Sequence, residues 1–183
     1  MRKLSLQEFV TLDGVMESPE KWNGAFWSDE LEVYARDRLF EADALVLGRA
    51  TYEAFVSSWP LRSGDDFSDR INSLPKYVAS RTLRNPGWNA SVIDGDVAEE
   101  VTNMKAQPGR DLLVYASGEL VNTLMAHDLI DDYRIWVFPI VFGAGKRLFD
   151  RHDSKALKLV DTRSFDTGVV ILSYTPAGRL PQA

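Results

Sequence analysis

The sequence predicts an α/β fold in which helices cover a mixed, twisted β-sheet of about eight strands. Two observations lead to this prediction. Short apolar runs alternate with amphipathic segments as far as residue 130, which is the pattern of parallel strands joined by right-handed crossovers. The chain then closes with a β-rich segment at 133–141 and two runs at 157–165 and 169–174, which have the pattern of an antiparallel hairpin.

Composition and charge narrow the class of protein. The chain has 183 residues, of which 45% are hydrophobic and 26% charged, and this suits one domain with a substantial core. We expect the domain to span residues 1–176 and a flexible tail to occupy 177–183. The formal charge of −6 would repel a phosphate backbone, so nucleic acid is not an expected partner.

Cysteine content, histidine content and hydropathy exclude further classes. The absence of cysteine rules out disulfides, thiolate catalysis and cysteine-ligated zinc, and two histidines are too few for a histidine-based metal site. Any metal would need carboxylate ligands, and we expect none. The N-terminus lacks an apolar leader segment, and no stretch approaches the ~18 apolar residues of a membrane span. These features favour a soluble, cytoplasmic protein with no membrane partner.

Strand and helix signals can be placed along the whole chain. Apolar runs that stop at glycine or polar turn residues favour strands, and apolar residues at three- and four-residue spacing favour helices. In the first half these signals predict a strand at 4–10, a turn at 13–14, a loop over 15–27, a helix from Ser28 to about Ala42, a strand at 44–47 and a helix at 49–55. Further on they predict strands at 77–79 and 91–93, a helix at 97–105, a strand at 112–115 and a helix over 120–129.

The strongest local signal for binding is Gly48, which lies between a buried strand and a helix start. A glycine at this point lets backbone N–H groups approach an anion at the positive end of the helix. Arg49 and Thr51 would add a charge and a hydroxyl. A plain strand-to-helix turn with a solvated arginine explains the pattern equally well.

Two other strand ends carry side chains suited to an anion. One is followed by Ser80 and Arg81, and the other by Ser117 and Gly118 at a helix start. Because ligands of open α/β sheets gather at the carboxyl ends of strands, these two ends and Gly48 reinforce one another as one site. Taken singly, the first is more often a polar loop and Ser117 a helix N-cap.

The loop at 15–27 carries three aromatic residues, Trp22, Phe26 and Trp27, which are costly to leave in water. A loop that covers a binding site would use them. Packing of the loop onto the sheet is the alternative, and it is the favoured role for at least one of the three.

Five segments give the chain a resemblance to a known family: TLDG at 11–14, LVLGRATYE at 45–53, VASRTL at 78–83, YASGELVNTL at 115–124 and VFPIVFGAGKRLF at 137–149. In this order they resemble the dihydrofolate-reductase-like family. More narrowly, the chain is similar to stand-alone relatives of the C-terminal reductase domain of bacterial riboflavin biosynthesis, from about residue 3 to residue 174. The resemblance implies a three-layer αβα dihydrofolate-reductase-like fold with a C-terminal antiparallel hairpin, and NADPH as the cofactor.

The resemblance also implies roles for individual residues. Its cofactor-binding residues would be Gly48, Arg49 and Thr51 at the pyrophosphate, Ser80, Arg81 and Thr82 at the adenosine 2′-phosphate, and Ser117, Gly118, Glu119 and Leu120 beside the pyrophosphate and nicotinamide. The segment that closes over nicotinamide and substrate would include Asp13, Gly14, Trp22, Phe26 and Trp27. Relatives often have a Gly-Gly pair, sometimes joined by a cis peptide, where this chain has Ala116-Ser117-Gly118. A cis bond there would cost ~2.5–4 kcal/mol.

Two departures from the family pattern bear on the substrate. The riboflavin-pathway reductases have an Asp-x-Pro-x-Leu segment and an arginine that help to hold the ribosylated pyrimidine, whereas residues 54–60 here are AFVSSWP. The acidic residue that binds the pterin ring in dihydrofolate reductases has Asp29 and Glu30 near its place. We take Asp29 as the first candidate for proton donor, Glu30 as the second and Asp13 as the third. Burial should raise the pKa of whichever faces the site.

The favoured hypothesis is an NADPH-dependent reductase that delivers hydride to a C=N or C=C bond of a small heterocycle of the pteridine, folate or aminopyrimidine type. A nucleotide-binding protein of the same fold without efficient turnover, and a protein that uses a flavin, are the alternatives. The apolar run at 134–142 exceeds the needs of one strand face, which predicts a homodimer. A strand buried on both faces within one subunit is the other explanation.

Overall fold

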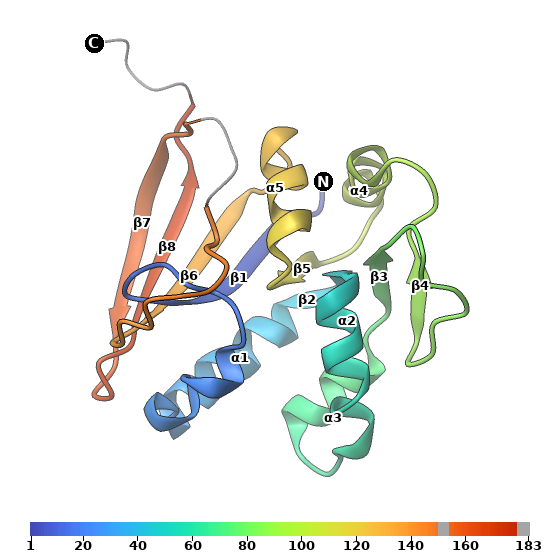
Figure 1. The fold of residues 1–183 in the computed structure, drawn as a ribbon. Coiled ribbons are helices and arrows are strands. Elements are labelled where there is room, and N and C mark those ends of the chain that lie inside the picture. Colours follow the sequence, from blue (N-terminus) through green and yellow to red (C-terminus); the bar gives the residue numbers. More distant parts are fainter. Residues whose placement is uncertain (150–153, 179–183) are drawn as a thin grey trace.

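The computed structural model describes residues 1–149 and 154–178, and it contains one eight-stranded mixed sheet in the order β4-β3-β2-β5-β1-β6-β8-β7 (Figure 1). The strands are β1 (Leu4–Thr11), β2 (Ala42–Gly48), β3 (Lys76–Ala79), β4 (Ala90–Val92), β5 (Asp111–Tyr115), β6 (Asp132–Phe138), β7 (Leu157–Ser164) and β8 (Val170–Pro176). Strands β1 to β6 pair with one another in parallel, and β8 pairs antiparallel with both β6 and β7. The predicted mixed sheet and closing hairpin are confirmed.

The helices of the described residues are α1 (Asp29–Glu41), α2 (Arg49–Val56), α3 (Asp66–Ser73), α4 (Val97–Ala106) and α5 (Gly118–Ala126), with short 3-10 turns η1 (Pro19–Lys21), η2 (Gly24–Phe26) and η3 (Trp59–Leu61). Ser28 caps α1 as predicted, because its hydroxyl accepts the N–H of Leu31 at 3.4 Å. Helix α3 was not predicted; the N-terminus of α3 is capped by Asp65, which accepts the N–H of Ser68 at 2.8 Å. Helix α5 ends at Ala126, three residues before the predicted end at 129.

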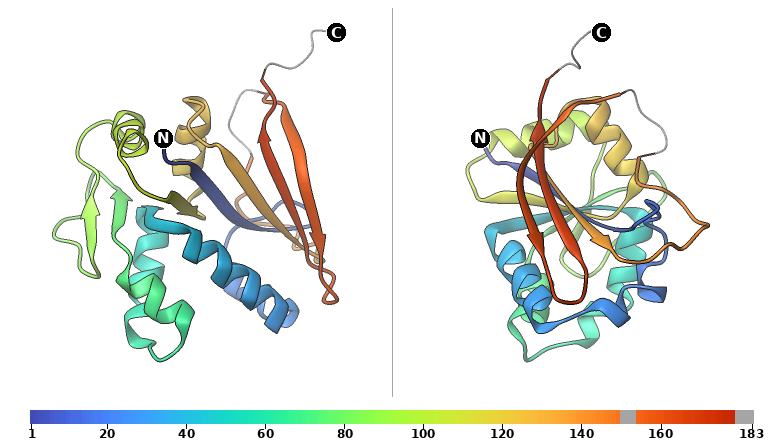
Figure 2. Two further views of the ribbon diagram at one scale, coloured as in Figure 1. Left: turned by 180° about the vertical axis from the view of Figure 1, so that it is seen from behind. Right: turned by 90° about the vertical axis from the view of Figure 1, so that its left-hand side faces the viewer.

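Helices cover both faces of the sheet and make three layers (Figure 2). Helices α4 and α5 bury apolar side chains against one face, where Leu6 of β1 and Val114 of β5 lie. Helices α1, α2 and α3 cover the other face, which holds Leu113 of β5 and Trp136 of β6. No helix among residues 1–149 and 154–178 is long and apolar enough to cross a membrane.

The connections after β1 and β5 leave the sheet on opposite faces, because β1 leads to α1 and β5 leads to α5. These two parallel strands are neighbours, so the point between their carboxyl ends is the topological switch point at which open α/β sheets bind ligands. The strands also differ in reach: Gln7 is paired with Tyr115, the last residue of β5, while β1 continues to Thr11. A gap beside β1 therefore opens beyond Gln7.

Strand β6 is buried on both faces within one subunit. It lies between β1 and β8, with Ile135 under the α4–α5 layer and Trp136 under the α1 layer. The predicted β-rich run to residue 141 ends as a strand at Phe138, and Val141 and Phe142 beyond it are exposed. Burial within the monomer thus accounts for the apolar run as far as Phe138, and the homodimer stays a prediction.

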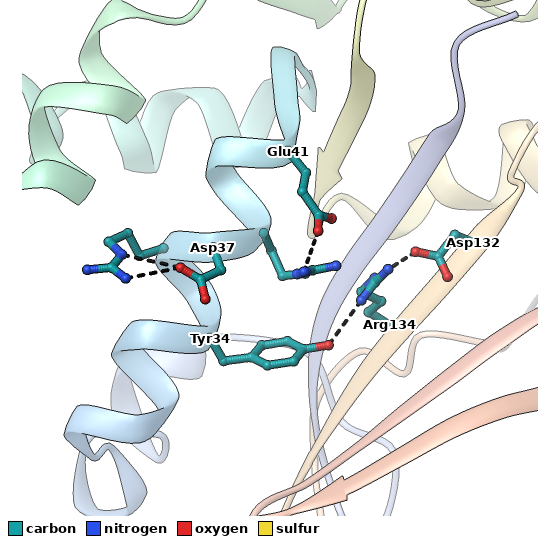
Figure 3. A network of polar contacts seen from close by, with 7 residues as sticks. Tyr34, Asp37, Glu41, Asp132 and Arg134 are labelled. Carbon is teal, nitrogen blue, oxygen red and sulfur yellow. Dashed lines mark hydrogen bonds and ion pairs between the residues drawn. The ribbon is translucent and has the colours of Figure 1, made fainter.

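A polar network ties α1 to the sheet (Figure 3). The guanidinium of Arg134 donates to Asp132 at 2.6 Å and to the hydroxyl of Tyr34 on α1 at 3.1 Å. These contacts fix the helix that carries the acidic candidates Asp29 and Glu30. The last strand ends at Pro176, and the expected tail lies largely outside the described residues.

Candidate functional site

The carboxyl ends of β2 and β5 are joined by hydrogen bonds around the hydroxyl of Ser117. This hydroxyl accepts the backbone N–H of Gly48 at 2.8 Å and lies 2.7 Å from the hydroxyl of Thr51. It also donates to the carbonyl of Tyr115 at 3.1 Å. Three predicted cofactor-binding residues from two distant segments, Gly48, Thr51 and Ser117, are therefore in direct contact.

Gly48 is required by this close approach. A Cβ atom at Gly48 would lie 2.9 Å from both Cβ and Oγ of Ser117, which is closer than real Cβ atoms come. Its φ is −75°, so a left-handed conformation is not the reason for glycine here. Arg49 and Ala50, the first residues of α2, are exposed.

The turn between β5 and α5 is strained. Ala116 and Ser117 have φ values of 47° and 78°, in the left-handed region that non-glycine residues rarely occupy. The cost is about 1–2 kcal/mol per residue. The described chain has no cis peptide bond, so the bonds of this turn are trans. Such strain clusters at functional sites, which marks the turn as a candidate ligand contact.

Arginine side chains flank the same edge at the end of β3. The guanidinium of Arg49 contacts the hydroxyl of Thr82 and donates to Glu53 at 2.7 Å. Ser80 is engaged as a turn residue, since its hydroxyl accepts the N–H of Leu83 at 3.0 Å. Arg81 is exposed, and within the described part of the chain no hydrogen bond or ion pair involves its guanidinium. This cation is available for an anion.

The other three members of the predicted α5 turn have different positions. Glu119 is exposed in the first turn of the helix, whereas Leu120 is buried in the core beneath α5. Gly118 is close to the loop after β1, because a Cβ there would lie 3.0 Å from Sδ of Met16. The turn and that loop therefore meet at the switch point.

Asp13 fastens the loop after β1 to the segment after β6. Its carboxylate accepts the hydroxyl of Thr11 at 2.6 Å and the N–H groups of Phe142 and Gly143 at 3.0 and 2.9 Å. These hydrogen bonds lower its pKa to about 2. A carboxyl group that stays ionised at neutral pH is a poor proton donor, so the geometry gives Asp13 a structural role. Gly14 beside it has a φ of 84°, as the turn requires.

The three loop aromatics pack on the sheet. Trp22 is only 4% exposed, and both it and Phe26 contact the ring of Phe138 at centroid distances of 5.3 and 6.3 Å. Trp27 is 38% exposed and stacks on Trp136 with centroids 6.0 Å apart. Trp22 therefore packs on the sheet, which was the alternative interpretation of this loop. Trp27 is the aromatic residue of the loop that is both exposed and placed over the sheet.

Asp29 and Glu30 are both exposed at the start of α1. The expectation that one of them faces inward is wrong, because the apolar stripe of α1 turns Leu31, Tyr34 and Ala35 toward the sheet instead. Asp29 borders a shallow hollow of about 240 Å³ between α1 and α3. The hollow is lined by Asp29, Glu32, Val33, Arg36, Asp65, Asp66 and Phe67.

A family model described as the RibD C-terminal domain matches residues 2–171. The chain belongs to this family. Two proteins of Bacillus subtilis (strain 168) are similar to it along most of their length. YyaP is 32% identical over 180 residues, which cover 94% of each chain, and YwjB is 29% identical over 177 residues, which cover 92% of this chain and 95% of YwjB.

Solved structures related to RibD share the fold. A putative riboflavin biosynthesis protein from Shewanella sp. PV-4 has a TM-score of 0.76 at 20% identity, covering 96% of this chain and 99% of that one. The deaminase/5-amino-6-(5-phosphoribosylamino)uracil reductase of Thermotoga maritima has a TM-score of 0.66 at 17% identity, covering 96% of this chain and 57% of that longer chain. Together with the sheet order, these similarities confirm the expected dihydrofolate-reductase-like fold.

Three buried polar residues of this RibD-family domain were not among the predicted site residues. Gln7 and Glu8 of β1 and Tyr115 of β5 are 2%, 3% and 8% exposed. Among the described residues, each has a side-chain oxygen without a hydrogen-bond partner: Oε1 of Gln7, Oε2 of Glu8 and Oη of Tyr115. The sequence did carry a signal, because Glu8 is a charged residue on the face of the opening strand that is otherwise formed by Leu4, Leu6 and Val10. All three residues border the gap between β1 and β5.

Proposed function

We propose that the protein is an NADPH-dependent reductase that transfers hydride to a C=N or C=C bond of a small heterocycle of the pteridine, folate or aminopyrimidine type. The observation that carries this proposal is the topological switch point between β1 and β5, bordered by the strained 116–117 turn and the Gly48–Ser117 contact. Membership of a family of riboflavin-pathway-type reductases supports the reaction class. Bound NADPH would supply the hydride.

The residues at the edge of the sheet suit the cofactor. The start of α2 after Gly48 offers backbone N–H groups to the pyrophosphate, and Thr51 and Ser117 add hydroxyls. Arg81 offers an unpaired guanidinium to the adenosine 2′-phosphate, with Ser80, Thr82 and Arg49 beside it. Gly118 and Glu119 would lie nearer the nicotinamide. Leu120 would support the turn from the core rather than contact the cofactor.

The α1 side of the crevice suits a flat heterocycle. Gln7 and Tyr115 are register partners on adjacent strands, and within the described residues they leave an amide oxygen and a phenol oxygen unpaired, with the ring of Phe55 5.9 Å from that of Tyr115. Buried atoms of this kind favour a ligand that brings both a donor and an acceptor, as the edge of a pterin or aminopyrimidine does. Trp27 stacks over the same face and would cover the bound ring. Movement of the Trp27 ring away from the sheet would admit the substrate.

The missing Asp-x-Pro-x-Leu segment argues against a phosphorylated substrate. Residues 54–60, AFVSSWP, carry no cation that could hold a phosphate. This favours an uncharged heterocycle over the ribosyl phosphate of the riboflavin pathway.

The proton donor is either an acid at the start of α1 or water. Asp29 remains the first candidate and Glu30 the second, but both are exposed, so a proton relay through water is as compatible with the geometry. The absence of a buried acid among the three predicted candidates is what favours the second candidate function, a nucleotide-binding protein without efficient turnover. A flavin in the same crevice is a further alternative.

The test is a titration of tryptophan fluorescence with NADPH, NADH and FMN, followed by NADPH oxidation with a panel of pterins and aminopyrimidines. Arg81→Ala should weaken NADPH binding by ~1.5–3 kcal/mol and scarcely change NADH binding. Arg110→Ala is the matched control, because Arg110 is exposed at the opposite edge of the sheet, before β5. Equal losses for NADPH and NADH would remove Arg81 from the 2′-phosphate site. Tighter binding of FMN than of either nucleotide would favour the flavin.

A further inference from the structure

Glu8 is a buried carboxyl group to which neither the packing of the core nor the proposed binding site assigns a role. It lies in the middle of β1 and is 3% exposed. Because side chains alternate along a strand, it faces the same side as Leu6 and Val10, which belong to the core under α4 and α5. Its register neighbour on β6, Ile135, belongs to that core too. An ionisable group in such surroundings is costly unless it has a function.

The position of the carboxyl group follows from the early end of β5. Alternate residues of β1 make backbone hydrogen bonds toward β5, since the carbonyls of Lys3 and Gln7 accept the N–H groups of Leu112 and Ala116. The next N–H on that side belongs to Phe9, and β5 no longer reaches it. Oε1 of Glu8 accepts this N–H at 3.1 Å, and Oε2 has no hydrogen-bond partner in the part of the chain that the structure describes. The carboxyl group therefore occupies the backbone gap at the switch point.

The surroundings of Glu8 provide no counter-charge. Burial raises its pKa to about 8, opposed only by the hydrogen bond from Phe9. Arg134 and Asp132 on β6 are paired with each other, and Arg134 extends to Tyr34 on the opposite face. Four charged residues on the adjoining loops and on α5 are exposed: Glu17, Glu119, Lys146 and Arg147. Tyr133 of β6 is buried on the same face as Glu8, and burial raises its pKa to about 12, so it stays neutral. Glu8 therefore holds a proton at neutral pH.

We propose that Glu8 senses the charge of the nicotinamide ring: binding of the oxidised, positively charged nucleotide at the switch point releases the proton of Glu8, and binding of the reduced nucleotide does not. This inference rests on the proposed function. It needs no direct contact, because a charge acts across several ångströms in a dry crevice. The O–H bond of Glu8 breaks, solvent takes the proton, and no electron moves. The proton returns when the oxidised nucleotide leaves.

The size of the effect follows from Coulomb's law. A positive charge ~6 Å from the carboxyl group, at an effective dielectric constant of about 20, favours the ionised form by a factor of about 100. With a group that is protonated up to about pH 8 in the free protein, this corresponds to release of about 0.8 proton per NADP⁺ bound at pH 7. The affinity for NADP⁺ should rise about 50-fold from pH 6 to pH 9, relative to the affinity for NADPH.

Isothermal titration calorimetry at pH 7, in two buffers of different ionisation enthalpy, counts the protons released. NADP⁺ and NADPH carry the same 2′-phosphate, so titration of that phosphate is common to both and the difference reports the ring charge. We expect about 0.8 more proton released with NADP⁺ than with NADPH in the wild-type protein. This comparison needs no variant, so it decides the question even if a variant does not fold.

Two variants locate the released proton. Glu8→Gln, which keeps the shape and an acceptor for the Phe9 N–H, should abolish the difference between the nucleotides. Glu20→Gln removes an exposed carboxylate from the loop after β1 and should leave the difference intact. Binding of both nucleotides with equal proton release would overturn the inference and leave the proposed function standing. No binding of either nucleotide would overturn both.

Discussion

Stability of the nucleotide-free protein should fall between pH 5 and pH 8, and Glu8→Gln should remove most of this fall. The cause is the buried carboxyl group of Glu8, whose pKa is raised from 4.5 to about 8 by burial. The folded protein keeps the proton over a pH range in which the unfolded chain releases it. Stability therefore decreases as pH rises through this range.

The magnitude follows from the two pKa values. Below pH 4.5, protonated Glu8 stabilises the folded protein fully, relative to an ionised group at this position. This stabilisation is lost as the pH rises to about 8. Each pH unit between these limits changes the free energy of unfolding by about 1.4 kcal/mol, so the loss from pH 5 to pH 8 approaches ~4 kcal/mol. The lowered pKa of Asp13, about 2, lies below this range. Lys76, whose pKa is lowered by burial to about 8, changes charge mainly above it.

Urea unfolding followed by tryptophan fluorescence at pH 5, 6.5 and 8 measures the effect. The free energy of unfolding of Glu8→Gln, minus that of wild type, should rise by ~3–4 kcal/mol from pH 5 to pH 8. The slope of the free energy of unfolding against urea concentration should be the same in both proteins. Subtracting the variant cancels every other titrating group. Parallel pH profiles for the two proteins would show that Glu8 ionises freely, and the placement of its carboxyl group in the β1–β5 gap would then be wrong.

Three further predictions concern the site and the assembly. Gly48→Val should lower the free energy of unfolding by ~1–3 kcal/mol through the clash with Ser117, and the folded fraction should bind neither NADPH nor NADH in a fluorescence titration. If Asp29 donates the proton, Asp29→Asn should keep NADPH affinity and lower kcat by about 10²- to 10⁴-fold, whereas unchanged turnover in both Asp29→Asn and Glu30→Gln would identify water as the proton source. Sedimentation at micromolar concentration should show a homodimer; a monomer alone would refute the dimer and leave burial of β6 inside one subunit as the explanation of the run as far as Phe138.

Much of the fold could be predicted because local patterns and tertiary burial agree. Apolar runs ending at glycine located β2 and its turn, and the spacing of apolar residues located α1 with its Ser28 cap. Helix α3 escaped prediction because it has eight residues and buries only Ser68 and Ile71. Its stability comes from the Asp65 cap and from packing beside α1, neither of which a periodicity of two turns can display.

The sequence predicted which strand ends meet, but it predicted the positions of individual side chains less well. Gly48 was correctly placed near Ser117, but the reason for glycine is a steric contact across 69 residues of sequence, which no local pattern contains. The orientation of Asp29 and Glu30 was open to prediction, since the phase of the stripe through Leu31 and Tyr34 already turns both outward. The position of the Glu8 carboxyl group could not be predicted without the register of β5. Because that strand ends early, the N–H of Phe9 has no partner on β5 and donates to Glu8 instead.

The unfavourable features of this molecule gather at the gap between β1 and β5. Ala116 and Ser117 are held in a left-handed conformation there, and the region includes three of the eight buried side-chain atoms that lack partners among the described residues, on Gln7, Glu8 and Tyr115. Each such feature costs about 1–3 kcal/mol, while a domain of this size is stable by only ~5–15 kcal/mol. An apolar residue at position 8, such as occupies positions 6 and 10 on the same face, would remove one of these costs without disturbing the sheet. The start of α1, by contrast, has a well-capped helix with exposed acids and no comparable cost. We therefore expect ligand binding in the gap, with the α1 acids at its margin.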